Sequence, residues 1–88
     1  MKLNPDYIPR ELMDDFLLLP SGQAALDFNG IITLNEMGRD IFQLLPQVEN
    51  EEALTQRLLE EYDVGEEELR ADLSEFLSQL RERNILLD

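Results

Sequence analysis

The sequence predicts an α+β fold in which a three-stranded antiparallel sheet is followed by three helices. Apolar residues occur in short, strand-length runs up to residue 34 and at helical spacing after residue 36. Between the two halves, residues 29–38 have the pattern of a turn, a short strand and a helix start. The 88 residues, of which 43% are hydrophobic, are enough to bury one core. We therefore expect a single domain over residues 1–88.

A flexible arm is predicted over residues 1–9. Pro5 and Pro9 each remove a backbone donor and fix φ, which disfavours regular structure in this segment. Tyr7 and Ile8 are the candidate anchors that hold the arm to the core.

A β-meander is predicted over residues 12–34. An unbroken apolar run that ends at a Pro-Ser-Gly turn signal favours a strand over residues 12–19, with a helix as the competing interpretation. One face of residues 24–28 would carry Ala24, Leu26 and Phe28 and the other Ala25 and Asp27, which is the period-two pattern of a half-buried strand. An Asn-Gly pair then suits a tight hairpin turn, so we expect residues 31–34, which are mostly β-branched, to pair with residues 24–28.

Three helices are predicted over residues 35–84. The first covers residues 36–45, because Asn35 offers an N-cap oxygen and Pro46 cannot continue the helix. Gly38 lies inside this helix, which hints at close packing there. The second helix opens near Asn50 and breaks at an Asp-Val-Gly sequence.

The third helix is the clearest element. Three glutamates occupy its first turn and two arginines its last, as the helix dipole favours. Asn84 suits the left-handed conformation that ends a helix, and Ile85-Leu86-Leu87 forms an apolar tail able to fold back on the core. The buried stripes of the three helices are expected to be Leu34, Met37, Ile41, Leu44 and Leu45, then Leu54, Leu58, Leu59 and Tyr62, then Leu69, Leu73, Phe76, Leu77 and Leu80.

The composition excludes several classes of function. The net charge of −13, with only 7 basic residues, disfavours binding to nucleic acid or to an anionic membrane. Cysteine and histidine are both absent, which removes the commonest nucleophile, general base and metal ligands. We expect no catalytic residue, no metal and no cofactor. No apolar run has the length of a membrane helix or signal peptide, so a cytoplasmic location is expected.

Two features could carry chemistry but are better explained otherwise. The acidic pairs and triplets lack the spacing of a calcium loop and read as solvated faces. Acyl or peptidyl carrier proteins have an Asp-Ser-Leu motif at a helix start, whereas the order here is Asp72-Leu73-Ser74 and falls in mid-helix. A carrier protein is therefore kept as an alternative.

The edge of the predicted sheet is the remaining candidate site. The last strand has one paired side, and an extended peptide could add to the other side as a further strand. Apolar strand residues are mostly core, so the residues alone leave both interpretations open.

Several segments of the chain resemble the PqqD-like family. The resemblance rests on residues 26–36, on the run at residues 58–64, and on the spacing of the third-helix stripe before an Arg-Asn-Ile-Leu sequence. It covers about residues 12–87, and the Leu-Asn-Glu junction at residues 34–36 is its most specific part. The family's Asp-Gly turn after the first helix is missing here, and Asn84 replaces its glycine after the last helix.

The resemblance implies a winged-helix-like peptide-binding domain, also called a RiPP recognition element. Such a domain captures the leader segment of a ribosomally made precursor peptide, while a modifying enzyme, often of the radical S-adenosylmethionine type, acts on the core peptide, as in coenzyme PQQ synthesis. The leader adds beside the third strand and lies against the third helix. The peptide-binding residues carried over by the resemblance are Ile31, Ile32, Thr33, Leu34, Leu69, Asp72, Leu73, Phe76, Gln79 and Arg83.

A winged-helix adaptor between proteins is a further alternative. An uncovered edge strand also leaves open a homodimer, formed by edge pairing or by a swapped hairpin.

Overall fold

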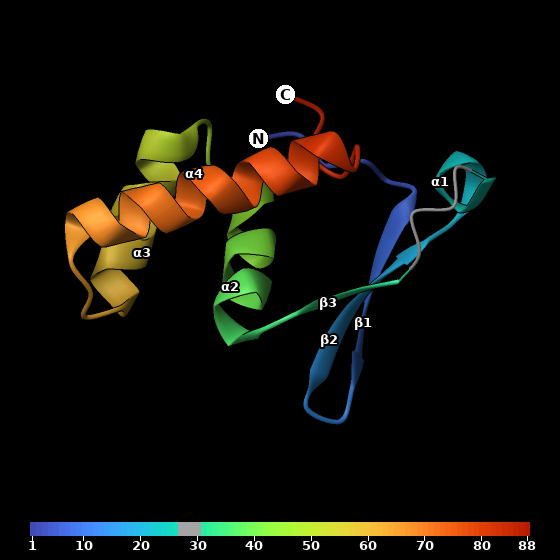
Figure 1. Ribbon diagram of the computed structural model, residues 1–88, viewed down its shortest axis with the longest axis horizontal. Coiled ribbons are helices and arrows are strands. Elements are labelled where there is room, and N and C mark those ends of the chain that lie inside the picture. The colour runs from blue at the N-terminus through green and yellow to red at the C-terminus, as the bar shows by residue number, and fades with distance from the viewer. Residues whose placement is uncertain (27–30) are drawn as a thin grey trace.

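The structure is a computed structural model, and it describes residues 1–26 and 31–88. The described part contains strands β1 (Tyr7–Leu12), β2 (Asp15–Pro20) and β3 (Ile32–Leu34) and helices α1 (Gly22–Leu26), α2 (Glu36–Leu44), α3 (Glu51–Glu61) and α4 (Glu66–Glu82). A short 3-10 turn, η1 (Leu45–Gln47), follows α2. The sheet lies at one end of the molecule and α3 at the other, with α2 between them and α4 running alongside (Figure 1). The expected α+β fold, a three-stranded antiparallel sheet with three longer helices after it, is confirmed.

The sheet has the order β1-β2-β3, and both pairs are antiparallel. The predicted pairing of residues 24–28 with residues 31–34 is wrong, because β3 pairs with β2 in the register Phe16 with Leu34. Helix α1 occupies part of that segment, and Leu26 on it is 78% exposed. Glutamine, alanine and leucine are strong helix formers, and here their propensity outweighs a short alternating pattern. The rest of the predicted second strand and its Asn29-Gly30 turn lie outside the described residues.

The arm predicted over residues 1–9 is also corrected. The sheet starts at Tyr7, so Tyr7, Ile8 and Pro9 belong to β1, and a two-residue turn with Met13 at φ 55° joins β1 to β2. Leu3 pairs with Leu86, which places the chain's first residues beside its last ones (Figure 1). Tyr7 is 4% exposed and confirms the expected anchor.

The three longer helices begin and end close to the predicted residues. Asn35 and Asn50 accept from the backbone N–H groups of Gly38 and Ala53, at 2.7 Å and 2.9 Å. Asn84 takes a φ of 60°, as expected for a residue that ends a helix. The tail after it folds back as predicted, with Ile85 and Leu86 buried.

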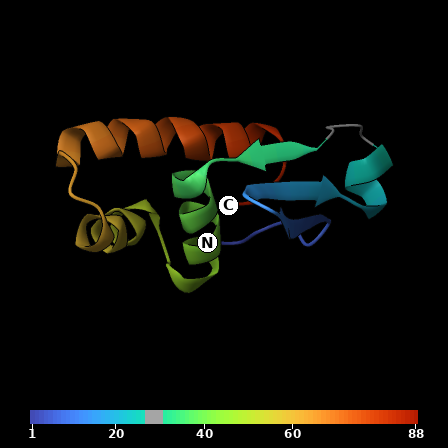
Figure 2. The ribbon, with the colours of Figure 1, turned by 90° about the horizontal axis from the view of Figure 1, so that it is seen from below.

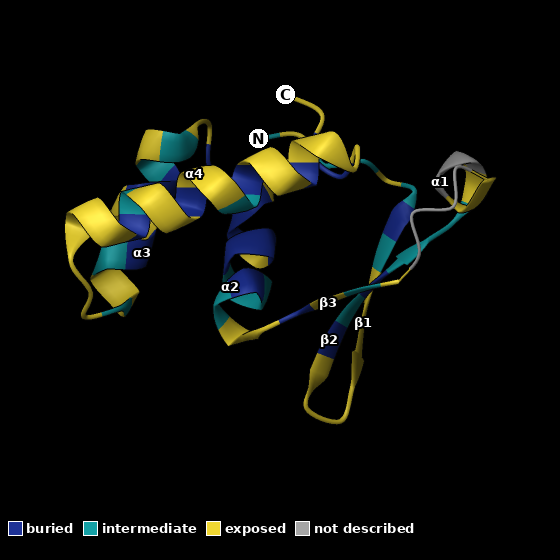
Figure 3. Cartoon of the chain, in the orientation of Figure 1, coloured by how far each residue is buried: buried dark blue, intermediate teal, exposed yellow. Residues whose placement is uncertain are grey.

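One core joins the sheet to the helices. The buried faces of α2, α3 and α4 point toward one another and toward the inner face of β2, whereas the turn between β1 and β2 is exposed (Figure 3). Phe16 and Phe42 stack at a tilt, with ring centroids 6.1 Å apart, and join the sheet to α2. No helix in the described ranges has the length and apolar character needed to cross a membrane.

Candidate functional site

The hydrogen-bonding pattern of the sheet follows from its prolines. Opposite residues of an antiparallel pair alternate between bonded and non-bonded positions, and a proline has no N–H with which to form a bonded pair. Pro9 lies opposite Leu18 and Pro20 lies opposite Tyr7, so the two prolines occupy pairs that are two positions apart and both belong to the non-bonded set. The Ser21 backbone N–H donates to the Asp6 carbonyl at 2.7 Å, so the position after Pro20 is a bonded one. All three observations fit a single alternation.

This alternation sets which backbone groups of β3 are free to bind something else. The odd-numbered residues of β2 bond to β1, so its even-numbered residues direct their N–H and C=O groups toward β3. Leu34 and Ile32 lie opposite Phe16 and Leu18, and they therefore form the bonded pairs. It follows that Thr33 directs its N–H and C=O away from β2, toward the open edge of the sheet. The Thr33 side chain is exposed as well.

A hollow of about 280 Å³ lies between this edge and the second half of α4. Figure 2 shows β3 on the side of the sheet nearest α4, with β2 and β1 farther away. The hollow is lined by Ile32, Thr33, Leu34, Asn35, Phe76, Gln79, Leu80 and Arg83.

Two further hollows continue from it along α4. The second hollow, of about 240 Å³, shares Asn35 and Phe76 with the hollow beside β3. The third hollow, of about 300 Å³, shares Leu69 and Asp72 with the second. We call the three hollows together the α4 groove. The second hollow is lined by Asn35, Met37, Gly38, Ile41, Leu69, Asp72, Leu73 and Phe76, and the third by Met37, Asp63, Val64, Gly65, Glu68, Leu69 and Asp72.

Nine of the ten peptide-binding residues expected from the sequence line this groove. The exception is Ile31, which precedes β3, is 64% exposed and lines none of the three hollows. That the ten residues bind a peptide stays a prediction.

The sequence analysis missed the wall of the groove that α2 supplies. Met37 and Ile41 are four residues apart and so lie on one face of α2, which is the signal that could have placed them beside the third-helix stripe. It also missed Asp63, Val64, Gly65 and Glu68, because only the fold brings the connection between α3 and α4 next to α2.

The junction of β3 and α2 holds the middle of the groove in place. The side-chain oxygen of Asn35 accepts the Gly38 N–H, which fixes the first turn of α2 directly after the strand. A Cβ on Gly38 would lie 3.2 Å from that oxygen and 3.3 Å from the Leu34 Cβ. Glycine therefore allows the helix to approach the strand this closely, and the expected close packing is confirmed.

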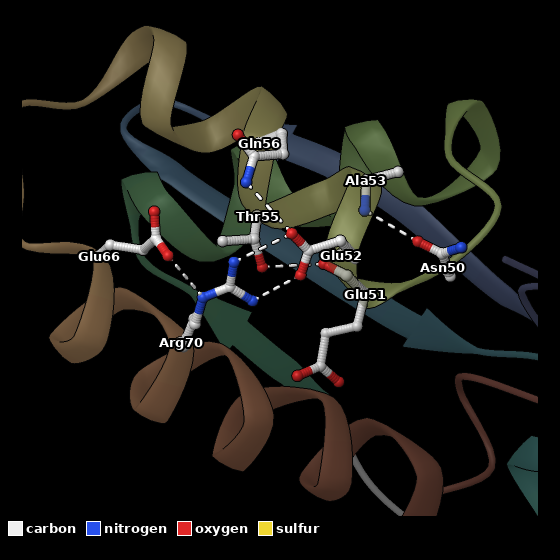
Figure 4. Close-up of polar contacts among 8 residues, drawn as sticks. All are labelled: Asn50, Glu51, Glu52, Ala53, Thr55, Gln56, Glu66 and Arg70. Carbon is white, nitrogen blue, oxygen red and sulfur yellow. Dashed lines mark hydrogen bonds and ion pairs between the residues drawn. The ribbon is translucent and has the colours of Figure 1, made fainter.

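Helices α3 and α4 are tied together by Arg70. Its guanidinium donates to both carboxylate oxygens of Glu52, at 2.6 Å and 3.0 Å, and to Glu66 at 3.1 Å (Figure 4). The bond from Arg70, with a smaller effect from Gln56, lowers the pKa of the Glu52 carboxyl. The same carboxylates raise the pKa of Arg70. These groups are exposed, so the pair orients α4 more than it stabilises the fold.

The other end of α4 is held by the chain's first residues. The buried Tyr7 donates its hydroxyl to the Arg83 carbonyl at 3.1 Å, and the Asn4 side chain donates to the Asn84 carbonyl at 2.8 Å. Both ends of the helical wall of the groove are thus fixed by polar contacts.

Comparisons with known proteins agree with this architecture. The family model of coenzyme PQQ synthesis protein D (PqqD) matches residues 16–86. The structure is similar to a solved structure described as TbiB1 in complex with the TbiA(beta) leader peptide, with a TM-score of 0.79 and 24% sequence identity over 99% of this chain and 95% of that one. A search among curated proteins finds no match. Because the family model matches most of the chain, including β2, β3 and the three longer helices, the protein belongs to the PqqD family.

Proposed function

We propose that this protein is a non-catalytic binding module that captures the leader segment of a ribosomally synthesised precursor peptide and presents it to a modifying enzyme. The observation that carries the proposal is the open edge at Thr33, whose outward N–H and C=O lie beside the α4 groove. Membership of the PqqD family and the likeness to TbiB1, which was solved with a leader peptide, support the same conclusion.

Capture takes place by strand addition. One residue of the leader exchanges two backbone hydrogen bonds with Thr33, so that the leader becomes the fourth strand of the sheet. Main-chain bonds are independent of sequence, so selectivity comes from side chains that enter the groove. Phe76 and Leu73 on α4 and Ile41 on α2 offer apolar contacts for those side chains.

The protein itself contributes no chemistry in this account. Binding orders the leader and thereby keeps the core peptide close to the enzyme that modifies it, which raises the effective concentration of the core. We propose a radical S-adenosylmethionine enzyme as that partner, on the strength of the family.

The test is an amide chemical-shift titration. Synthetic leader peptides encoded by precursor genes next to this gene are added to the isotope-labelled protein, which is first shown to be monomeric. We expect saturable shifts on residues 31–34 and along the Leu69–Leu80 face of α4.

Two results would contradict the proposal. One is the absence of any shift with every encoded leader, in a protein that is folded. The other is saturable binding that moves only residues far from β3 and α4. A mass increase on Ser74 after expression in the source organism would favour the carrier alternative.

A further inference from the structure

The α4 groove changes its chemistry along its length. Beside β3 it offers backbone groups and Gln79, and its middle is lined by Met37, Ile41 and Phe76. Its far end, between α2 and the start of α4, carries the carboxylates of Asp63, Glu68 and Asp72. A ligand that follows the whole groove therefore meets strand, apolar and acidic surfaces in that order.

The length of the groove sets the spacing of the groups a ligand must present. Asp72 precedes Gln79 by seven residues and Glu68 precedes it by eleven, which correspond to about 10 Å and 16 Å along a helix. An extended peptide covers those distances in about three to five residues.

No cation of the described residues neutralises the far end. Arg70, on the same half of α4, is held by Glu52 and Glu66, and none of the groove's three carboxylates forms an ion pair with another described residue. In the described part of the groove lining, the only positive side chain is Arg83, at the opposite end.

The helix dipole opposes this acidity without cancelling it. The N-terminus of α4 contributes roughly half a positive charge. Glu66, Glu67 and Glu68 in the first turn outweigh that contribution, and Asp63 and Asp72 add to the negative side. The local field at this end is therefore negative.

We propose that the α4 groove selects a leader segment with a lysine or arginine about three to five residues from the residue that pairs with Thr33, separated from it by apolar side chains. This rests on the proposed function and adds the class of peptide that the groove accepts. The cation lies over the far end of the groove, its stem covers Met37 and Leu69, and the intervening apolar residues fill the middle hollow.

The probe is an array of overlapping peptides from the precursor genes next to this gene, with lysine, glutamine or glutamate placed in turn at every position. We expect one position at the stated spacing where lysine binds roughly tenfold more tightly than glutamate, because several exposed carboxylates act together there. Lysine elsewhere changes binding less.

Two triple variants locate the effect. Asp63→Asn with Glu68→Gln and Asp72→Asn removes three charges from the groove and should abolish the preference for lysine. Glu49→Gln with Glu60→Gln and Glu75→Gln removes the same number of charges from exposed positions that line no part of the groove, and should retain it. Circular dichroism shows that both variants are folded.

A charge reversal gives a second readout. Asp72→Lys should bind the glutamate peptide better than the lysine peptide at the same position. Two results would overturn the inference and leave leader capture standing. One is binding of the peptides with no preference for lysine at any position, and the other is an equal loss of that preference in both triple variants. If no peptide in the array binds at all, leader capture fails and the inference fails with it.

Discussion

The two edges of the sheet differ in what their backbones offer. By the alternation that directs the Thr33 backbone outward on β3, residues 7, 9 and 11 direct their backbone groups toward the open edge of β1. The Tyr7 N–H donates to the Asn4 carbonyl at 3.2 Å, and Pro9 has no N–H, while its carbonyl accepts from the Arg10 side chain at 2.8 Å. The β1 edge is therefore closed to a further strand over residues 7–9 and keeps outward backbone groups only at Glu11, whereas no described residue bonds to the outward groups of Thr33 on β3.

Hollow volume does not distinguish the two edges. A largely apolar hollow of about 390 Å³ lies beside β1 and is lined by residues that include Leu3, Pro9 and Phe42. It is larger than the hollow of about 280 Å³ beside β3. What differs is where the outward backbone groups lie. On β1 they remain available only at Glu11, next to the exposed turn, whereas on β3 they belong to Thr33, in the middle of the strand and beside the α4 groove.

Proline substitutions in β3 should have the largest effects, and they should separate folding from binding. Thr33→Pro removes the outward N–H and should weaken leader binding at least tenfold, through the lost bond and the ring at the edge, while the fold survives. Ile32→Pro removes a bond to β2 and should cost about 2 kcal/mol or more of stability. Calorimetric titration and urea unfolding measure the two quantities.

Thr33→Val is the matched control, because it keeps the N–H and suits a strand. It should bind leader like the original protein. If Thr33→Pro destabilised the fold as much as Ile32→Pro does, the alternation of bonded positions along β3 would be wrong.

Restoring a backbone donor on β1 should make that edge able to pair. Pro9→Val restores an outward N–H on β1 and adds a strand-forming residue. We expect concentration-dependent self-association through β1, seen by analytical ultracentrifugation, with leader binding at β3 unchanged. A strictly monomeric variant at millimolar concentration would show that Pro9 is not what protects this edge.

Removing the two asparagine N-caps should have smaller effects, which are similar on stability but different on leader binding. Asn35→Ala and Asn50→Ala should each cost about 1 kcal/mol in urea unfolding, because each leaves a helix N–H without its side-chain acceptor. Only Asn35 lines the groove, so only its loss should also weaken leader binding. Equal effects on binding would argue against the β3–α2 junction as part of the site.

The smallest expected effect is on the pH dependence of stability, through a hydrogen bond between α2 and the residue after α3. Tyr62 donates its hydroxyl to the Asp40 carboxylate, and this bond raises the pKa of Tyr62 to about 12. A raised pKa means that the contribution to stability is complete below pH 10 and is lost as pH rises from 10 through 12. Unfolding monitored over that range should therefore show a steeper decline than in Tyr62→Phe, and identical slopes would contradict the bond.

Local signals allowed most of the helical half to be predicted. The caps at Asn35 and Asn50 and the left-handed Asn84 each depend on one side chain and its immediate neighbours, and all three are where the sequence placed them. The α4 side of the groove followed from helical spacing together with the family resemblance.

The sheet was harder to predict because strand pairing is not local. Pro9 disfavours a strand in isolation, but it is tolerated where its missing donor points to solvent, and only the register shows that it does. The alternation over residues 24–28 predicted a strand, but β2 already supplies the partner of β3, and α1 covers the first part of that segment instead. The acidic end of the groove likewise depends on how α2 meets the connection before α4.

Hydrogen exchange at the Thr33 amide distinguishes strand addition at β3 from any other mode of leader binding. In the free protein, the amides of Ile32 and Leu34 should exchange slowly because they bond to β2, and the Thr33 amide should exchange fast. Saturation with a leader peptide should protect Thr33 and leave its two neighbours little changed. A leader that binds tightly while Thr33 continues to exchange at its free rate would contradict capture by strand addition at β3.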